Sequence, residues 1–319
     1  MDWKRVIRET MLPLALVCGV SAYLIYHFNP VQKPIGHVCH EIASRGQITL
    51  IGVMLFLQYI RISPSDLKLQ KWHFAAVLTQ LSLCAALVVA VMLCPDGDWK
   101  ILLESALLCF ACPTAAAAGV ITERLGGNLA ATVTYVVLIS AVATLLIPAM
   151  VPLIHPSEEF SFLSYVWRLI LKIFPLLILP ALLAFAIRRF TPGLHKAIYK
   201  ISHLSFYIWG VSLSLGMVLA TRALVLSHAS ALLICGIGLV TVACCAAQYA
   251  AGKAIGARLG EGRSSSITAG QSLGQKNTGL VIWLGYNFMT PISSVGGGLY
   301  AIVQNIYNSW EIYRKDSSI

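Results

Sequence analysis

Long apolar stretches alternate along this chain with short segments rich in charge, proline or glycine. A helix needs about 20 apolar residues to cross a bilayer, and a backbone in hydrocarbon must satisfy its own hydrogen bonds, so each long stretch is predicted to be a helix. The second stretch is short for a span, and we expect it to extend back toward Glu41. The predicted spans cover residues 10–28, 46–60, 72–94, 101–123, 128–154, 162–190, 203–226, 230–251, 265–288 and 292–313.

Composition makes lipid the expected solvent for most of the surface. The chain has 319 residues, of which 58% are hydrophobic and 11% charged, and its mean hydropathy is +0.78, whereas about a quarter of a soluble domain is charged. The sequence therefore predicts an all-α polytopic membrane protein. The nine cysteines are scattered, mostly in spans, and form no disulfide framework. No small-residue cleavage site follows MDWKRVIRET, so we expect a retained first helix rather than a signal peptide.

The cations are distributed unevenly over the two sides of the predicted membrane. Of the 23 Lys and Arg residues, 16 fall on one side, three on the other and four within spans. Cytoplasmic loops carry the excess of Lys and Arg, so we expect a multi-pass protein of the cell inner membrane with both termini in the cytoplasm. The net charge of +10 then reflects topology, and no nucleic-acid partner is expected. The larger set is Lys4, Arg5, Arg8, Arg61, Lys68, Lys71, Arg124, Arg188, Arg189, Lys196, Lys200, Lys253, Arg258, Arg263, Arg314 and Lys315; the three opposite are Lys33, Arg45 and Lys100; those within spans are Arg168, Lys172, Arg222 and Lys276.

Five spans precede the loop near Pro156 and five follow it, which predicts two inverted repeats, residues 1–155 and 156–319. Under this mapping the fourth span corresponds to the ninth, and these two are the most irregular. The fourth contains Pro113 near its centre, and the ninth contains Gly274 beside a polar cluster. Paired interruptions at matching places in two repeats indicate a transport site, although proline and small residues can also serve close packing alone.

Three stretches resemble one known family. "CPTAAAAGVITERLGGN" (112–128) is similar to the C-P-G-G-T-A-S-N-V-M-T-Y-L-A-R-G-N pattern of the fourth helix in the bile acid:sodium symporter family. "GQKNTGL" (274–280) is similar to part of its ninth-helix E-x-G-x-Q-N motif, and "GGGLYAIVQN" (296–305) looks like P-G-A-L-x-x-V-x-x-N of the tenth. The resemblance covers essentially the whole chain. The chain looks like a divergent prokaryotic member of this family.

The resemblance implies a fold and an activity. Helices 1, 2, 6 and 7 would form a panel, helices 3–5 and 8–10 a core, and helices 4 and 9 would be broken and would cross, at Pro113, Gly119 and Gly274. The implied activity is secondary active transport of an organic anion by alternating access, without enzymatic chemistry or a cofactor. We expect a monomer in a lipid bilayer. In the family the crossing holds two sodium ions.

The departures from the family pattern put sodium in doubt. The Ser-Asn pair of helix 4 falls on Ala118 and Gly119, the helix-9 glutamate on Ser272, and the helix-9 glutamine on Lys276. Polar identity is kept at Thr132 and Asn277, and Gln80 matches a family glutamine. The resemblance thus implies a cation site, or its substitute, made of these polar residues; the set is Lys276, Gln80, Ser272, Gln275 and Thr132.

Lys276 lies about eleven residues into its predicted span, where a charge is costly unless it is paired or functional. Glu104 and Glu123, near the ends of the fourth span, are counted as the only carboxylates within spans. An ammonium carries the same charge as sodium and donates three hydrogen bonds, so we interpret Lys276 as a tethered substitute for the ion that bonds the unwound carbonyls. The alternatives are a lysine that snorkels to an interface and a proton carrier whose burial lets it discharge.

The substrate is expected beside the crossing. The N-terminal ends of half-helices favour anions, and Thr114, Asn277, Thr278 and Asn305 could supply hydrogen bonds. An apolar groove would hold the rest of the molecule, which leaves a sterol, a keto acid or a pantoate-like acid open.

Other functions remain as alternatives. The transporter could be coupled to sodium or protons, or it could be a sensor that does not transport. "CFAC" (109–112) could serve a soft ion such as arsenite, although arsenite exporters place their cysteine after the proline. "HVCHE" (37–41) does not have the spacing of a standard zinc site and is expected to be a loop. Arg168 and Lys172 mark one face of the sixth span and are expected near the interface, and "RLGEGRSSS" (258–266) is expected to be a basic loop.

Overall fold

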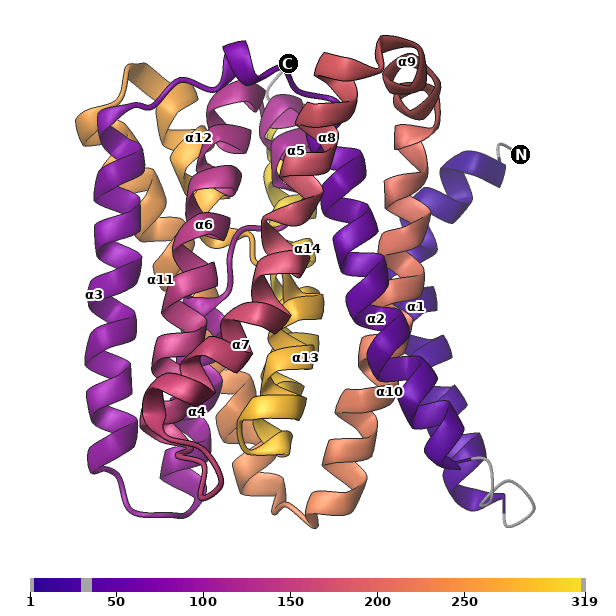
Figure 1. The fold of residues 1–319 in the computed structure, drawn as a ribbon, viewed down its shortest axis with the longest axis vertical. Coiled ribbons are helices and arrows are strands. Elements are labelled where there is room, and N and C mark those ends of the chain that lie inside the picture. Colours follow the sequence, from indigo (N-terminus) through magenta and orange to yellow (C-terminus); the bar gives the residue numbers. More distant parts are fainter. Residues whose placement is uncertain (1–2, 30–35, 317–319) are drawn as a thin grey trace.

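The computed structural model describes residues 3–29 and 36–316, and this part of the chain is almost entirely helical. The long helices lie side by side and run between two ends of the molecule (Figure 1). The α-helices are α1 (Trp3–Phe28), α2 (Gly36–Tyr59), α3 (Lys71–Leu93), α4 (Asp98–Ala111), α5 (Ala118–Leu125), α6 (Leu129–Ile154), α7 (Phe162–Leu177), α8 (Leu179–Phe190), α9 (Pro192–Ile201), α10 (Ser205–Ser227), α11 (Ala231–Leu259), α12 (Gly262–Gly274), α13 (Thr278–Phe288) and α14 (Val295–Asp316), with 3₁₀ turns η2 (Pro64–Asp66), η3 (Ser202–Leu204) and η4 (Pro291–Ser294).

Several helices are suited to lipid. By length and hydropathy, five segments of the described chain could cross a membrane, or six if α7 and α8, which are bent by 42° at their junction, count as one. Large apolar side chains point outward along them; Leu78 is 65% exposed, Leu145 65% and Leu239 72%. Water would make such a surface unfavourable, whereas lipid tails match it. The chain is therefore a helical multi-pass membrane protein.

The helix bounds differ from the predicted spans in three places. The helix α2 reaches back to Gly36, and an extension toward Glu41 was expected. The prediction that "HVCHE" is a loop is wrong, because these residues lie within α2. The segment after Arg189 forms α9, whose start is favoured by Pro192 at its first position. The predicted basic loop at 258–266 is mostly helical, because α12 begins at Gly262. The sequence pattern missed these turns because their polar residues resemble those of loops.

The helices pack in two groups. In one, α10 lies against α1 and α2, and α2 also contacts α7 and α8. In the other, α11 packs along α12 and against α4 and α14, and α3 packs against α4 and α6. The groups meet where α10 and α2 contact α13 and where α7 follows α6. The larger apolar core belongs mostly to the second group and includes Leu107, Ile147 and Leu280.

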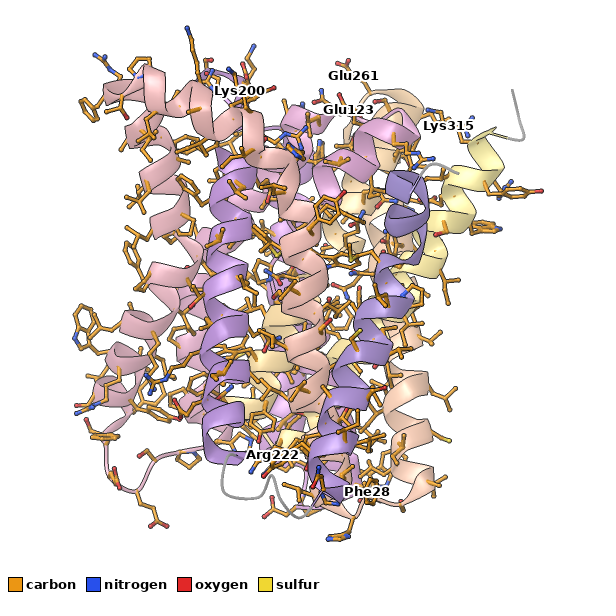
Figure 2. The ribbon with its side chains drawn as sticks, turned by 90° about the vertical axis from the view of Figure 1, so that its right-hand side faces the viewer. Phe28, Glu123, Lys200, Arg222, Glu261 and Lys315 are labelled. Atoms are coloured by element: carbon orange, nitrogen blue, oxygen red, sulfur yellow. The ribbon has the colours of Figure 1, made fainter. Side chains whose placement is uncertain are left out.

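The cationic connections gather at one end of the molecule. The α2–α3 connection, the α8–α9 corner and the C-terminal part of α14 lie at that end (Figure 1), as do Lys200 and Lys315 in Figure 2, while Phe28 and Arg222 lie toward the other end. At the opposite end Lys100 donates a 2.7 Å hydrogen bond to Asp96, and this bond lowers the pKa of the Asp96 carboxyl. Lys33 and the side chains of Lys4, Arg5 and Arg8 lie outside the described part of the structure.

Candidate functional site

Two helices are interrupted at the positions that the sequence predicts. The fourth predicted span is split into α4, which ends at Ala111, and α5, which begins at Ala118. Pro113 has no N–H and disfavours helical backbone at the residue before it, and Cys112 is accordingly extended, with ψ of 142°. The ninth span is split into α12 and α13 by three residues, of which Gln275 is extended with ψ of 118°. Both predicted breaks are therefore confirmed.

The two breaks cross and pair with each other. Thr114 and Lys276 form an antiparallel bridge, in which the Asn277 N–H donates to the Pro113 carbonyl at 2.9 Å and the Ala115 N–H donates to the Gln275 carbonyl at 3.1 Å. The Thr114 hydroxyl donates to the Ser272 carbonyl at 2.5 Å. Each break thereby satisfies backbone groups that the other exposes, as non-helical backbone at membrane depth requires.

Side chains from other helices satisfy more of the unwound backbone. Gln304 of α14 accepts from the Lys276 N–H at 3.0 Å and donates to the Lys276 carbonyl at 3.4 Å. The Tyr300 hydroxyl donates to the Gly274 carbonyl at 2.7 Å. Gln47 of α2, in the other helix group, donates to the Gly279 carbonyl at 2.9 Å. Side chains of both helix groups thus form hydrogen bonds with the unwound segment or the residues next to it, two from α14 and one from α2.

The Lys276 ammonium lies at the centre of this crossing. Its side chain is fully buried, which excludes snorkelling to an interface. Its Nζ donates to Oε1 of Gln80 on α3 at 2.9 Å, and Gln80 in turn donates to the Cys112 carbonyl at 3.4 Å. Tyr135 donates to the same Gln80 oxygen at 3.4 Å. The expectation that the ammonium bonds the unwound carbonyls is therefore wrong, because the ammonium bonds the Gln80 side chain and it is Gln80 that bonds the Cys112 carbonyl of the break.

No ion pair joins Lys276 to a carboxylate of the described residues. Glu104, which the sequence places in the same span as one of the breaks, accepts instead from the Thr290 N–H at 2.9 Å and from the Thr290 hydroxyl at 3.1 Å. Glu123 is exposed on α5. The positive charge at the crossing is consequently balanced by dipoles rather than by a neighbouring acid.

The four predicted substrate-binding residues lie at or near the crossing in different settings. Thr114 is buried and its hydroxyl is used by the bond to Ser272. Asn277 caps α13 by accepting from the Leu280 N–H at 3.2 Å, and Thr278 is the first residue of that helix. Asn305 is half-buried on α14, and its amide donates to the Ala301 carbonyl at 2.7 Å.

The remaining members of the predicted cation site differ in their distance from the break and in their hydrogen bonds. The Ser272 hydroxyl is buried and has no hydrogen-bond partner among the described residues. Gln275 lies in the break, and its amide donates to the Gln271 side chain at 2.5 Å. Thr132 donates to the Asn128 carbonyl of its own helix at 3.1 Å, and the described structure shows no hydrogen bond from it to the crossing.

One predicted helix-break residue is wrong. Gly119 lies inside α5, where its small size serves packing, because a Cβ there would meet the Leu129 and Val133 side chains of α6. Gly274 ends α12 directly before the break, with the Tyr249 ring lying against it. Only Pro113 and Gly274, of the three predicted positions, border or lie in a break.

Several residues at the site were not found from the sequence. Gln47, Gln304 and Tyr300 contact the unwound backbone, yet the sequence assigned none of them a role at the site. Tyr300 and Gln304 are hydrogen-bonding side chains well inside the predicted span 292–313, which is the same signal that singled out Lys276, whereas Gln47 lies at the start of the span 46–60 and carries no such signal. Glu311 was also missed as a carboxylate within a span, although it lies inside the predicted tenth span.

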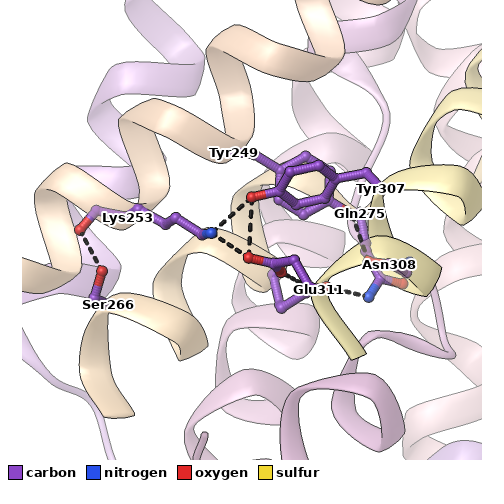
Figure 3. A network of polar contacts seen from close by, with 8 residues as sticks. Tyr249, Lys253, Ser266, Gln275, Tyr307, Asn308 and Glu311 are labelled. Carbon is purple, nitrogen blue, oxygen red and sulfur yellow. Dashed lines mark hydrogen bonds and ion pairs between the residues drawn. The ribbon is translucent and has the colours of Figure 1, made fainter. Parts of the chain in front are cut away.

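Glu311 belongs to a network of polar contacts that includes Lys253, Tyr307 and Gln275 (Figure 3). It forms an ion pair with Lys253 of α11, whose ammonium also donates to Tyr307 at 2.6 Å. The other Glu311 oxygen accepts from Gln271 at 2.7 Å, and Gln271 accepts from Gln275 in the break. Lys253, predicted as a cytoplasmic-side cation, is thus partly buried and paired.

The other cations predicted within spans contact aromatic rings. Arg222 of α10 donates to the Tyr286 hydroxyl of α13, a contact between the two helix groups. Arg168 lies 4.0 Å from the centre of the Phe160 ring, and Lys172 lies 5.5 Å from that of Phe288. Such contacts are favourable for cations at sites with little water.

The cysteine and histidine candidates form no metal-binding cluster in the described part of the structure. Cys109 and Cys112 are fully buried in and after α4, and no cluster of three or more His, Cys, Asp or Glu side chains that could hold a metal is found in the described residues. The side chains of His37, Cys39 and His40 lie outside the described part of the structure.

The fold and site define a helical multi-pass membrane protein with two broken helices that cross around a buried lysine. Comparisons with protein-family models and with curated proteins find no match to this chain. The family resemblance therefore rests on the three motifs, two of which form the crossing described above.

Proposed function

We propose that this protein is a secondary active transporter of an organic anion, working by alternating access. It has ten spans in two inverted repeats, with the bent pair α7–α8 and the broken pairs α4–α5 and α12–α13 each counted as one span. The panel consists of α1, α2, α7–α8 and α10, and the core of α3–α6 and α11–α14. The substrate binds between them, beside the crossing.

The observation that carries this proposal is the pairing of the two breaks around Lys276. A pair of interrupted helices near mid-membrane is the arrangement by which transporters expose backbone dipoles to a substrate. The bridge between Thr114 and Lys276 supports it because it joins one interrupted helix from each half of the chain. A non-transporting sensor would have no need for such unwound backbone.

The buried ammonium favours an anionic substrate and independence from sodium. Two like unit charges about 4 Å apart at an effective dielectric constant near 20 repel by roughly 4 kcal/mol, close to a thousandfold in affinity. A sodium ion beside Lys276 would meet this repulsion, and no carboxylate of the described residues pairs with Lys276 to offset it. The N-terminal ends of α5 and α13, which begin just after the breaks, add positive potential for an anion.

The contact between Arg222 and Tyr286 supports the division into panel and core. It joins α10 to α13 across the boundary that the alternating-access cycle would open, near the end opposite to the cationic connections. With both termini in the cytoplasm, that end faces outward, and the contact would help to close the outer side.

Uptake into proteoliposomes tests the proposal. Radiolabelled candidates from three classes, a bile acid, a keto acid and pantoate, are offered in sodium and in choline buffers. We expect uptake of at least one of them, equal in both buffers within about twofold, and loss of uptake in Lys276→Ala with uptake retained in Lys196→Ala, an exposed lysine of α9. Uptake that rises steeply with sodium and is unaffected by Lys276→Ala would refute the role of the lysine.

Replacing Lys276 by a neutral residue and Ser272 by a carboxylate should make uptake depend on sodium. Lys276→Gln removes the ammonium and Ser272→Glu supplies a carboxylate at a hydroxyl that has no partner in the described structure. We expect the double variant to depend on sodium, and the Lys276→Gln variant alone to do so less. Uptake driven by a pH gradient in the wild type would instead favour the proton-coupled alternative, in which Lys276 loses and regains its proton.

A further inference from the structure

A second polar site lies away from the crossing, at the end of the molecule that carries most cations. A cavity of about 480 Å³ opens there between α5, α11, α12 and the last turns of α14. Four of its lining side chains are cationic and one is anionic. The cations are Lys253, Arg263, Arg314 and Lys315, and the carboxylate is Glu311.

The one carboxylate of the cavity is already engaged. Glu311 is paired with Lys253 and accepts from Gln271, and its side chain is only 12% exposed. One of the four positive charges is therefore compensated within the described structure, while the guanidinium groups of Arg263 and Arg314 form no ion pair with the described residues.

The two guanidinium groups keep most of their donors for a ligand. Arg263 is exposed and makes no hydrogen bond or ion pair with the described residues. Arg314 lies over the Trp310 ring, 5.0 Å from its centre. Lys315 donates to the Arg124 carbonyl at 2.8 Å, which holds its ammonium at the rim.

This charge pattern fits a phosphate better than a carboxylate. A guanidinium fork matches phosphate oxygens in a bidentate geometry, and a phosphate monoester carries about −1.5 to −2 charges near neutral pH. The two guanidinium charges match such a dianion, whereas one carboxylate would leave one of them uncompensated. The cavity is also larger than a phosphate group, and Leu125, Ile267 and Trp310 offer an apolar wall to the group esterified to it.

We propose that this cavity binds a phosphate monoester whose organic part contacts Trp310. The ester is either the headgroup of an anionic lipid or a soluble molecule, since both present the same dianion. The site is separate from the crossing and requires no transport, so its test is independent of the transporter proposal.

Binding is measured by calorimetry on the full chain in a neutral detergent at low salt. Phenyl phosphate is the soluble probe, and benzoate is its matched control with the same ring and a carboxylate. Mixed micelles with phosphatidic acid or with phosphatidylcholine supply the lipid arm. Saturable binding of phenyl phosphate alone identifies a soluble source, preferential binding of phosphatidic acid identifies a lipid source, and either supports the site.

Two double variants separate the cavity from general surface charge. Arg263→Gln with Arg314→Gln removes two cavity cations, and Arg188→Gln with Arg189→Gln removes two cations of the last turn of α8, outside the cavity lining. We expect the first pair to weaken binding by about tenfold or more and the second by less than about twofold. The single variant Arg263→Gln, at a side chain that has no hydrogen-bond or ion-pair partner among the described residues, keeps the test valid if the double variant melts early.

Three results would overturn the proposal. One is equal weakening in both double variants, which would show that only the positive surface attracts the probe. The second is benzoate binding as tightly as phenyl phosphate. The third is the absence of saturable binding of phenyl phosphate and of phosphatidic acid to the wild-type protein.

Discussion

At the scale of single residues, the unusual feature is a buried lysine that pairs with no acid among the described residues. A buried cation is tolerated only when dipoles or opposite charges replace its lost hydration. Here Gln80 supplies the oxygen that accepts from Lys276, and Tyr135 and the Cys112 carbonyl orient that amide. Removing the amide should therefore harm the protein more than removing the charge.

The first prediction concerns this pair. Gln80→Leu leaves the ammonium without its acceptor and should reduce the free energy of unfolding by about 1–3 kcal/mol or more. Lys276→Met, of similar volume, should leave the free energy of unfolding nearly unchanged or increase it. In the double variant, Lys276→Met should remove most of the loss in free energy of unfolding that Gln80→Leu causes alone. Melting of the purified variants in detergent measures this coupling. An equal loss from Gln80→Leu in both backgrounds would show that Gln80 does not support the ammonium.

At the scale of elements, the site depends on helices that stop in the right place. Pro113 ends one local helix by its own chemistry, while the break after Gly274 is stabilised by contacts from α4–α5, α11 and α14. Tyr249 of α11 lies against Gly274 and donates to Asn308 of α14 at 3.1 Å. The glycine therefore serves a close approach between helices rather than a special backbone angle.

The second prediction is that Gly274→Ala is harmful. Its Cβ would collide with carbon atoms of the buried Tyr249 ring, so we expect a loss of about 1–3 kcal/mol in stability together with loss of substrate uptake. Gly193→Ala on α9 is the matched control, because no atom lies within 4 Å of its added Cβ, and it should be neutral or slightly stabilising. Similar melting of the two variants would mean that the ring can move aside.

At the scale of the whole molecule, charge and apolar surface define an orientation. The cationic connections share one end (Figure 1), whereas Arg45 and Lys100, outside it, pair with Glu41 and Asp96. The bands of exposed apolar side chains on α3, α6 and α11 lie between the two ends. Lys and Arg excess marks the cytoplasmic side of membrane proteins, so the end with α9 and the last turn of α14 should face the cytoplasm.

The third prediction follows from this orientation. In a chain whose native cysteines are replaced, Asp98→Cys should react with a membrane-impermeant maleimide in intact cells, while Ser65→Cys should react only after permeabilisation. Both positions are exposed in the structure, so access to the reagent is not limited by burial. The reverse pattern would invert the proposed topology.

The sequence alone determined the features that arise from local chemistry. Apolar length located the helices, Pro113 and the glycine-rich polar segment located the breaks, and the cations marked one end, because each of these signals lies within a few consecutive residues. It also singled out Lys276 as a charge in the middle of a span. Gly119 was misassigned for a related reason, since a small residue near a break has the same local signature whether it unwinds a helix or packs inside one.

Tertiary structure decided which groups satisfy one another. Lys276 meets Gln80 across 196 positions of sequence, and Gln47 meets Gly279 across 232. Likewise, the pairing of Lys253 with Glu311 joins two helices that the sequence treated separately. No local pattern encodes these contacts, because a buried polar side chain takes whichever partner the packing of distant helices brings within hydrogen-bond distance.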